Sequence, residues 1–163
     1  MKDMVIKVAV ITVSDRSYRG EREDLSGKVL SQIAGQKLGQ VVHYTIVPDE
    51  LEIIKKEIIR CLDELKVDIV ITTGGTGISN RDVTPEATEE VIEKEMPGIS
   101  EIMRIKGFEH TPMSLLSRAK AGIRGKSIVV NLPGSPKAVE ESLDYIIPAL
   151  LHGIEILKGL SKE

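Results

Sequence analysis

Apolar and polar positions follow two patterns along the chain. In the first, short runs are almost entirely apolar and rich in β-branched residues, as from Val5 to Val13 and from Asp68 to Thr73. Runs with so little polar alternation predict strands that are covered on both faces, as parallel sheets require. Two more strands are predicted over Val41 to Val47 and Lys126 to Leu132.

In the second pattern, apolar residues recur every three or four positions, which predicts amphipathic helices. The clearest such stretch has its apolar residues at Leu51, Ile54, Ile58, Leu62 and Leu65. Another helix, through Val29 and its neighbours, should close near Gly35. A shorter helix is expected over Gly98 to Lys106, and the last helix from Ser135 to about Lys158.

Local signals mark where the helices begin. Thr84-Pro85-Glu86 combines a capping residue, a proline in the first turn and an acid, so Thr84 should be an N-cap. Asp49 stands three residues before Glu52, which is the spacing of a capping box. Ser135, directly before a proline, also predicts a cap. Pro148 should kink the last helix rather than end it.

Strands that alternate with helices imply right-handed β-α-β units. The predicted fold class is therefore α/β, with three layers (α/β/α) and a mainly parallel central sheet. No repeat or linker divides the sequence, so one domain over residues 1–163 is expected. Ligands bind such sheets beyond the carboxyl ends of the strands. Three polar segments follow strands in this way: Ser14-Asp15, Gly74 to Asp82, and Pro133 to Ser135.

Composition narrows the classes of function. The chain has 41% hydrophobic residues, as globular proteins do, and its net charge of -3 offers no basic face for nucleic acid. No signal peptide and no membrane span are expected, because no apolar run approaches ~20 residues. A cytoplasmic protein is therefore predicted. The single cysteine, Cys61, is interpreted as a buried inert thiol. The three histidines, His43, His110 and His152, lack ligand spacing, so zinc is not predicted.

A glycine-rich loop, Gly74-Gly75-Thr76-Gly77, follows the third predicted strand. Glycines adopt backbone angles closed to other residues and let an anion approach main-chain N–H groups. Three glycines in four residues exceed the needs of a tight turn, so an anion site is favoured over a bare turn. The loop is not a Walker motif, because no Gly-Lys-Ser/Thr follows it. Asn80 stands where the dinucleotide fingerprint needs its third glycine.

Charged residues near these loops suggest phosphate chemistry. Arg81 could neutralise a phosphate through two parallel hydrogen bonds. A carboxylate beside a phosphate is repelled unless a cation lies between them, so Asp82 indicates Mg²⁺. Alternatively, Asp82 satisfies N–H groups of its own loop. Asp49 is either a helix cap or a site carboxylate, and local sequence favours the cap. Pro133-Gly134-Ser135 leads into a helix N-terminus, which binds anions, although Ser135 also suits a simple cap.

Taken together, these segments resemble one family. They are Val13-Ser14-Asp15, Val47-Pro48-Asp49-Glu50, Thr72 to Gly77 with Arg81 to Thr88, Glu95-Met96-Pro97-Gly98, Leu116-Ser117-Arg118, Gly122 to Lys126 and Asn131 to Ser135. The family belongs to molybdenum cofactor biosynthesis and includes bacterial molybdopterin adenylyltransferase and the N-terminal domain of gephyrin. The likeness covers essentially the whole chain in the same order, and Gly74 to Thr88 is its most specific part.

The resemblance implies an α/β/α fold, usually a homotrimer, and a reaction. The terminal phosphate of molybdopterin attacks the α-phosphate of ATP, which gives adenylyl-molybdopterin and diphosphate. The product then passes to the enzyme that inserts molybdate. Asp49 and Asp82 match the family's essential carboxylates, which are expected to arrange Mg²⁺. The implied ligand-binding residues are Ser14, Asp15, Gly74, Gly75, Thr76, Gly77, Arg81, Ser117, Pro133, Gly134 and Ser135.

Two other hypotheses remain open at this point. One is a sibling protein of the same fold that binds molybdopterin, or serves as a trimeric scaffold, without catalysis. The other is an unrelated nucleotide-binding enzyme that uses the same kind of loop. Turnover of molybdopterin with ATP would separate them.

Overall fold

The structure is a computed structural model that describes residues 5–161. Its strands are β1 (Lys7–Val13), β2 (Gln40–Val47), β3 (Ile69–Thr73), β4 (Lys94–Glu95), β5 (Ala121–Arg124) and β6 (Ser127–Leu132). Its helices are α1 (Asp15–Tyr18), α2 (Leu25–Lys37), α3 (Leu51–Ile59), α4 (Thr84–Val91), α5 (Pro97–Phe108) and α6 (Pro136–Leu157). A π-helical turn, η1 (Arg60–Glu64), extends α3, and a 3₁₀ helix, η2 (Pro112–Leu116), follows α5.

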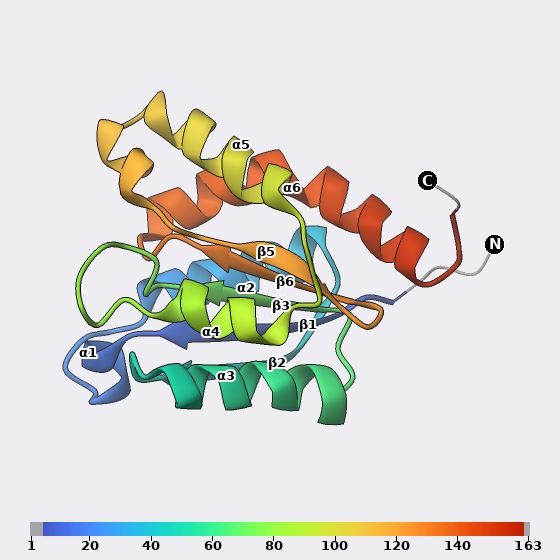
Figure 1. Cartoon of the computed structure of the whole chain (residues 1–163), viewed down its shortest axis with the longest axis horizontal. Helices are drawn as coiled ribbons and strands as arrows, with labels where there is room; N and C mark the ends of the chain where they lie inside the picture. Colours follow the sequence, from blue (N-terminus) through green and yellow to red (C-terminus); the bar gives the residue numbers. More distant parts are fainter. Residues whose placement is uncertain (1–4, 162–163) are drawn as a thin grey trace.

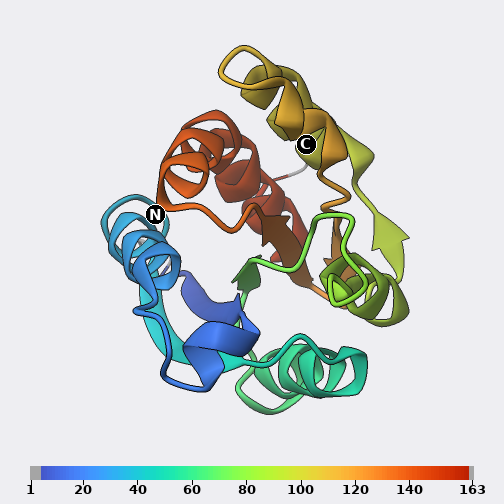
Figure 2. The same ribbon diagram turned by 90° about the vertical axis from the view of Figure 1, so that its left-hand side faces the viewer.

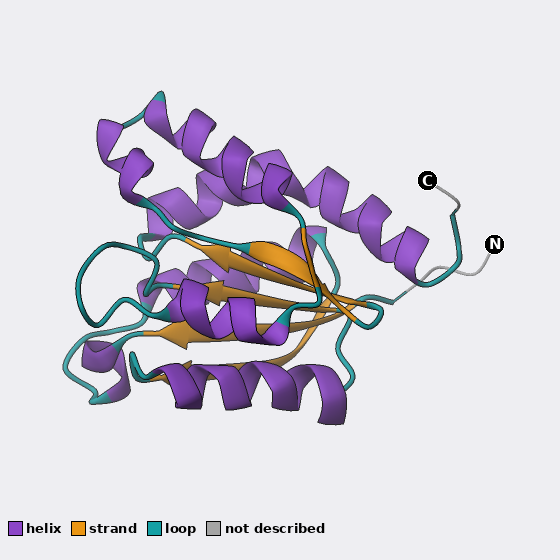
Figure 3. Ribbon diagram, viewed as in Figure 1, coloured by secondary structure: helices purple, strands orange, loops and turns teal. Residues whose placement is uncertain are grey.

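The strands form one mainly parallel sheet in the order β2-β1-β3-β6-β5-β4. Strands β2, β1, β3 and β6 run parallel, and β5 pairs antiparallel with both β6 and β4. Helices cover both faces of this sheet, so the molecule has three layers (Figures 1 and 3). The predicted α/β/α class with a mainly parallel sheet is confirmed.

Alternate residues of the central strands supply two separate hydrophobic cores. In β1, Val8 and Val10 belong to one core, and Ala9 and Ile11 belong to the other. The reason is that successive side chains of a strand face opposite sides of the sheet. Helices α2 and α6 complete the first core, and α3 and α4 complete the second. All four β1 side chains are fully buried, which explains the missing polar alternation.

Some local predictions are wrong. The sequence pattern does not predict β4, β5 or η2, because strands of two and four residues are too short to show a period. Thr84 does not cap α4: Val83 holds the N-cap position, and the Thr84 hydroxyl donates to the carbonyl of Gly74 at 3.0 Å. Asp49 does not cap α3, because Glu50 takes that position.

The last helix agrees with its prediction more closely. Ser135 is the N-cap of α6 and accepts a hydrogen bond from the Ala138 N–H at 3.1 Å. The helix continues through Pro148 to Leu157. Within residues 5–161, no helix combines the length and the apolar character that a membrane crossing requires. Met1 to Met4, which the sequence places ahead of the first strand, lie outside the described residues.

Candidate active site

The carboxyl ends of the parallel strands meet at one edge of the sheet, which faces the viewer in Figure 2. The strand order reverses between β1 and β3, and ligands of open α/β sheets bind outside such a switch point. Hydrogen bonds join the strand ends there. The N–H of Gly74 donates to the Leu132 carbonyl at 3.2 Å, and the N–H of Ser14 donates to the Val47 carbonyl at 3.0 Å.

Gly74 is a position that only glycine fits. Its φ is +98°, a region that side chains disfavour, and a Cβ there would lie 2.3 Å from the carbonyl oxygen of Val13. Gly75 also has a positive φ, +71°, and a Cβ there would lie 2.3 Å from the Thr84 hydroxyl. The predicted glycine loop therefore passes directly over the end of β1 and against the start of α4.

Two residues hold all four carbonyl groups of the loop. The Thr84 hydroxyl and N–H donate to the carbonyls of Gly74 and Gly75, at 3.0 and 3.1 Å. The Arg118 N–H and Nε donate to the carbonyls of Thr76 and Gly77, both at 2.8 Å. The loop carbonyls are thus turned toward the protein.

The loop amides are arranged differently. In the part of the chain that the structure describes, the N–H groups of Gly75, Thr76 and Gly77 have no hydrogen-bond acceptor. Consecutive unpaired N–H groups form a cradle for an anion, because buried or partly buried donors need a partner. This arrangement favours the anion-site interpretation of the loop over a bare turn.

Arg118 is a positioning residue that sequence reasoning missed. Besides the loop, its guanidinium donates to the Asp82 carbonyl at 2.8 Å and to the Glu86 carboxylate at 2.5 Å. One side chain thereby ties both ends of the segment that carries Gly77 and Asp82. Arg118 belongs to the Leu116-Ser117-Arg118 motif, but a lone arginine in a loop gives no local signal of such contacts.

Asp49 and Asp15 form two reciprocal hydrogen bonds, each from a main-chain N–H to the other residue's carboxylate. The Asp49 carboxylate accepts from the Asp15 N–H, and the Asp15 carboxylate accepts from the Asp49 N–H, both at 2.9 Å. Arg81 donates through Nε and Nη2 to the two Asp15 oxygens, each at 3.0 Å. Arg81 was predicted to bind a phosphate; in the structure its guanidinium is paired with Asp15, and its side chain lines neither cavity at the glycine loop.

Burial and neighbouring charges shift the pKa values of Asp15 and Asp49. Hydrogen bonds from Arg81, and then from the Asp49 N–H, lower the pKa of Asp15. Burial raises the pKa of Asp49, and the neighbouring carboxylates of Asp15 and Asp82 raise it further. Asp49 therefore lies where negative charge accumulates, which is the electrostatic setting of a cation site.

Two cavities open on the glycine loop. The smaller, of about 210 Å³, contains Ser14 and Asp49. The larger, of about 360 Å³, lies between the loop, α5, η2 and α6. Three residues line both cavities: Gly75, Asp82 and Gly134. The two cavities are thus compartments of one cleft, and Asp49 and Asp82 share the smaller of them.

The other predicted residues divide between the cleft and its supports. Ser117 and Pro133 line the larger compartment. Gly134 accepts a hydrogen bond from the Ser26 hydroxyl at 2.6 Å and packs against Gly74, where a Cβ would lie 3.3 Å from the Gly74 Cα. Ser135 and Asp15 line neither compartment. Ser135 caps α6 and so acts as a support.

The smaller compartment also contains Asp24, which sequence reasoning did not single out. Its carboxylate accepts from the Thr12 hydroxyl at 2.7 Å, from the Gly27 N–H at 2.9 Å, and from the Tyr44 hydroxyl. Asp24 is therefore the N-cap of α2 and an element of a buried polar network. In the sequence, the only indication of this role is that Asp24 is an acidic residue directly before the apolar pattern of the predicted helix.

The carboxylates of the cleft fit a hard cation such as Mg²⁺. One oxygen of Asp49 accepts from Asp15, and one oxygen of Asp82 accepts from the N–H and hydroxyl of Ser79, at 2.9 and 2.8 Å. Within residues 5–161 the second oxygen of each carboxylate has no hydrogen-bond donor. Carboxylate oxygens without donors are the ligands that Mg²⁺ prefers.

Known proteins are similar to this chain in sequence and in fold. A model of the family described as the probable molybdopterin binding domain matches residues 9–152. A molybdopterin adenylyltransferase of Helicobacter pylori strain J99 is 43% identical over 156 residues, covering 94% of this chain and 89% of that protein. Gephyrin of Dictyostelium discoideum is 37% identical over 165 residues, covering 95% of this chain and 23% of that protein.

A solved structure agrees with them. The molybdopterin biosynthesis enzyme MoaB from Thermus thermophilus superposes with a TM-score of 0.89 at 42% identity, and the match covers 95% of this chain and 98% of that one. The sequence match and the shared architecture extend over the cleft and its glycine loop. The chain therefore belongs to the probable molybdopterin binding domain family of molybdenum cofactor biosynthesis.

Proposed function

We propose that this chain transfers the adenylyl group of ATP to molybdopterin with the help of Mg²⁺. A terminal phosphate oxygen of molybdopterin forms a bond to the α-phosphorus of ATP, and the bond from that phosphorus to the diphosphate breaks. Adenylyl-molybdopterin and diphosphate are the products. The observation that carries the proposal is that Asp49 and Asp82, from two separate strand-to-helix connections, line one compartment beside an amide cradle.

The lining of the two compartments suggests how the substrates divide between them. Hydroxyl and carboxylate groups dominate the smaller compartment, which suits phosphates with a cation. In the larger compartment Met103 and Leu116 lie beside Tyr145 and His110, and these side chains suit a flat ring system. Because Asp82 borders both, the reacting phosphates would meet there.

Catalysis would rest on positioning and charge neutralisation, and no protein group need become covalently attached. The N–H groups of Gly75 to Gly77 would bind phosphate oxygens and stabilise charge as it develops. Asp49 and Asp82 would hold Mg²⁺, which when bound offsets the repulsion between two anionic substrates. Arg118 and Thr84 would keep the loop in shape without touching the substrate.

The decisive experiment measures diphosphate release from molybdopterin, ATP and Mg²⁺. Asp82→Asn keeps the shape of the side chain and removes its charge, so turnover should fall by about 10²-fold or more. The matched control is Asp144→Asn, an exposed aspartate paired with Lys37 on the outer surface. Full activity in Asp82→Asn would refute the mechanism.

The same assay separates the alternatives. Binding of molybdopterin without diphosphate release would identify a binding or scaffold protein. Nucleotide turnover with no preference for molybdopterin would identify an unrelated nucleotide-binding enzyme. A single domain over residues 1–163, a homotrimeric assembly, a cytoplasmic location and transfer of the product to a molybdate-inserting enzyme remain predictions that accompany the proposal.

A further inference from the structure

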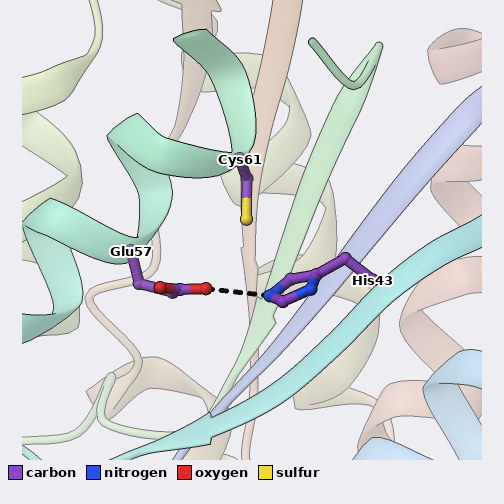
Figure 4. A group of neighbouring side chains, drawn as sticks. All are labelled: His43, Glu57 and Cys61. Carbon is purple, nitrogen blue, oxygen red and sulfur yellow. Dashed lines mark hydrogen bonds and ion pairs between the residues drawn. The ribbon is translucent and has the colours of Figure 1, made fainter. Parts of the chain in front are cut away.

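A second cluster of reactive side chains lies away from the cleft, between β2 and α3. It consists of His43 on β2, Glu57 on α3 and Cys61 at the start of η1. Their nitrogen, oxygen and sulfur atoms all lie within 4.8 Å of one another. In Figure 4 the Glu57 carboxylate faces the His43 ring, and the Cys61 sulfur points toward the space between them. None of the three lines the cleft.

The local structure brings these side chains to one place. Glu57 and Cys61 are four residues apart, so they lie on one face of the helix. The helix widens into a π-helical turn from Arg60 to Glu64, a feature that is frequent at functional sites. On β2, the side chain of His43 turns toward α3, while Tyr44 next to it is exposed.

The cluster is closed on one side and accessible on the other. Cys61 is fully buried, whereas the side chains of His43 and Glu57 keep 20% and 17% of their exposure. Burial raises the pKa of the Cys61 thiol to about 12, so a proton occupies the sulfur at neutral pH. A cation that binds all three side chains must therefore displace this proton from the sulfur.

The Glu57 carboxylate is shared between His43 and Arg60. His43 Nε2 lies 2.8 Å from Glu57 Oε1, a contact that needs a proton or a cation between the two lone pairs. Arg60 donates to the same carboxylate, from Nη2 to Oε1 at 3.0 Å and from Nε to Oε2 at 3.3 Å. A cation bound between His43 and Glu57 would take the place of the Arg60 guanidinium, whose half-exposed side chain can turn to solvent.

We propose that His43, Glu57 and Cys61 bind one divalent cation of the zinc class. An imidazole nitrogen, a thiolate and a carboxylate are ligands of Zn²⁺, whereas Mg²⁺ and Ca²⁺ prefer oxygen alone. On binding, the S–H bond of Cys61 breaks, a sulfur–metal bond forms, and the proton passes to solvent. The ion would join β2 to α3, the two elements on either side of Asp49.

Zinc is not predicted from the sequence, because that interpretation relied on the spacing of His and Cys along the chain. His43 and Cys61 are far apart in sequence, and β2 and α3 bring them together only in the folded protein. The interpretation of Cys61 as a buried thiol is compatible with the structure, and the proposal adds a ligand role to it.

The test uses the full chain after treatment with a chelator and dialysis. Titration with Co²⁺ should give a thiolate-to-cobalt charge-transfer band at one equivalent, and Zn²⁺ should displace the Co²⁺ and remove the band. Cys61→Ala and His43→Gln should each lose the band and the stoichiometric binding. The matched control is His152→Gln, because His152 faces Glu155 at 3.7 Å on the surface without a cysteine. This control should bind as the unchanged chain does.

A second measurement uses the unchanged chain, so its result does not depend on whether the Cys61 variant folds. In the unchanged chain, Zn²⁺ should slow the reaction of the Cys61 thiol with a thiol reagent, and Mg²⁺ should not. Absence of the band, or zinc binding that survives Cys61→Ala and disappears in Asp82→Asn, would overturn the proposal. Because the readouts are spectroscopic and chemical, their failure would leave the proposed adenylyl transfer untouched.

Discussion

Arg118 shows how much of the cleft depends on one residue that lines neither of its compartments. Its main-chain and side-chain donors hold the carbonyls of Thr76, Gly77 and Asp82. A carbonyl held in this way fixes the orientation of the neighbouring peptide N–H, because the peptide unit is planar. The direction of the loop amides is therefore determined from outside the loop.

Replacement of Arg118 by lysine tests this dependence. Lysine keeps the charge but cannot make the directed contacts to Gly77, Asp82 and Glu86. If each lost bond to a loop carbonyl is worth about 1 kcal/mol, adenylyl transfer should fall by about 10- to 100-fold. Steady-state kinetics would measure the change. Arg124→Lys is the control, since Arg124 makes similar contacts to Asp63 and Val91 outside the cleft. Equal losses in both variants would contradict the prediction.

Tyr44 offers a prediction about pH. The Tyr44 ring is partly exposed, but its hydroxyl reaches the buried Asp24. Desolvation of that hydroxyl, and then its hydrogen bond to the Asp24 carboxylate, raise the pKa of Tyr44 far above its ordinary value of 10.0. The folded state therefore favours the neutral phenol. Its contribution to stability is complete below pH 10.0 and is lost as the pH rises toward the folded-state pKa.

An alkaline titration followed by tyrosinate absorbance would check this. The chain has three tyrosines, and one of them should ionise clearly later than the others. In Tyr44→Phe that late component should be missing, while the earlier ones remain. A late component that persists in Tyr44→Phe would show that another tyrosine is responsible.

At the level of single residues, the sequence could predict a site residue only where the neighbouring residues in the sequence form a recognisable pattern. The glycine loop and Asp82 follow a buried strand, and both line the cleft. Asp49 has the local pattern of a helix cap, but the main-chain contact to Asp15 draws its side chain into the cleft. Arg118 gives no pattern at all, because its partners lie more than thirty residues away in sequence.

At the scale of elements, the glycine loop joins β3 to α4 through a conformation that allows no side chain at its first residue. Gly74 combines a positive φ with the close carbonyl of Val13, whereas Gly20, also at a positive φ of +75°, has open space around it. A side chain at Gly20 would cost backbone strain alone, whereas a side chain at Gly74 would cost backbone strain and steric overlap.

Alanine at each position would measure the difference. Gly20→Ala should lose about 1–2 kcal/mol of unfolding free energy, the cost of a left-handed alanine. Gly74→Ala should lose more and should also abolish turnover, because the loop must move off β1. Denaturant unfolding and the diphosphate assay report the two effects. Similar unfolding free energies for both variants would argue against close packing between Gly74 and the Val13 carbonyl.

Long elements were predictable and short ones were not. Strands β1 and β3 are long enough to show a continuous apolar run, which indicates burial on both faces. Helices α3 and α6 are long enough to show one apolar face that repeats every three or four residues. Strand β4 has two exposed residues, and its pairing with β5 depends on a partner that follows much later in the chain. Tertiary pairing, rather than local preference, makes such strands.

At the scale of the whole molecule, the assembly state follows from resemblance rather than from any pattern in the chain. Several large apolar side chains of α5 and η2 are exposed, namely Ile105, Phe108, Met113, Leu115 and Leu116. Sedimentation equilibrium at several protein concentrations should return the mass of a trimer of 17.9 kDa chains. A monomer over the whole range would refute the predicted homotrimer.

The strand order also governs when the cleft can exist. Paired residues of β1 and β3, and of β3 and β6, lie about sixty residues apart in sequence. The last of these strands supplies Leu132, to which Gly74 is bonded. During synthesis on the ribosome, the glycine loop leaves the ribosome before β6 does. The loop therefore cannot form its hydrogen bond to Leu132 until β6 has been synthesised and has emerged. Nascent chains that stop short of β6 should carry every glycine of the loop and still fail to retain a phosphate ligand.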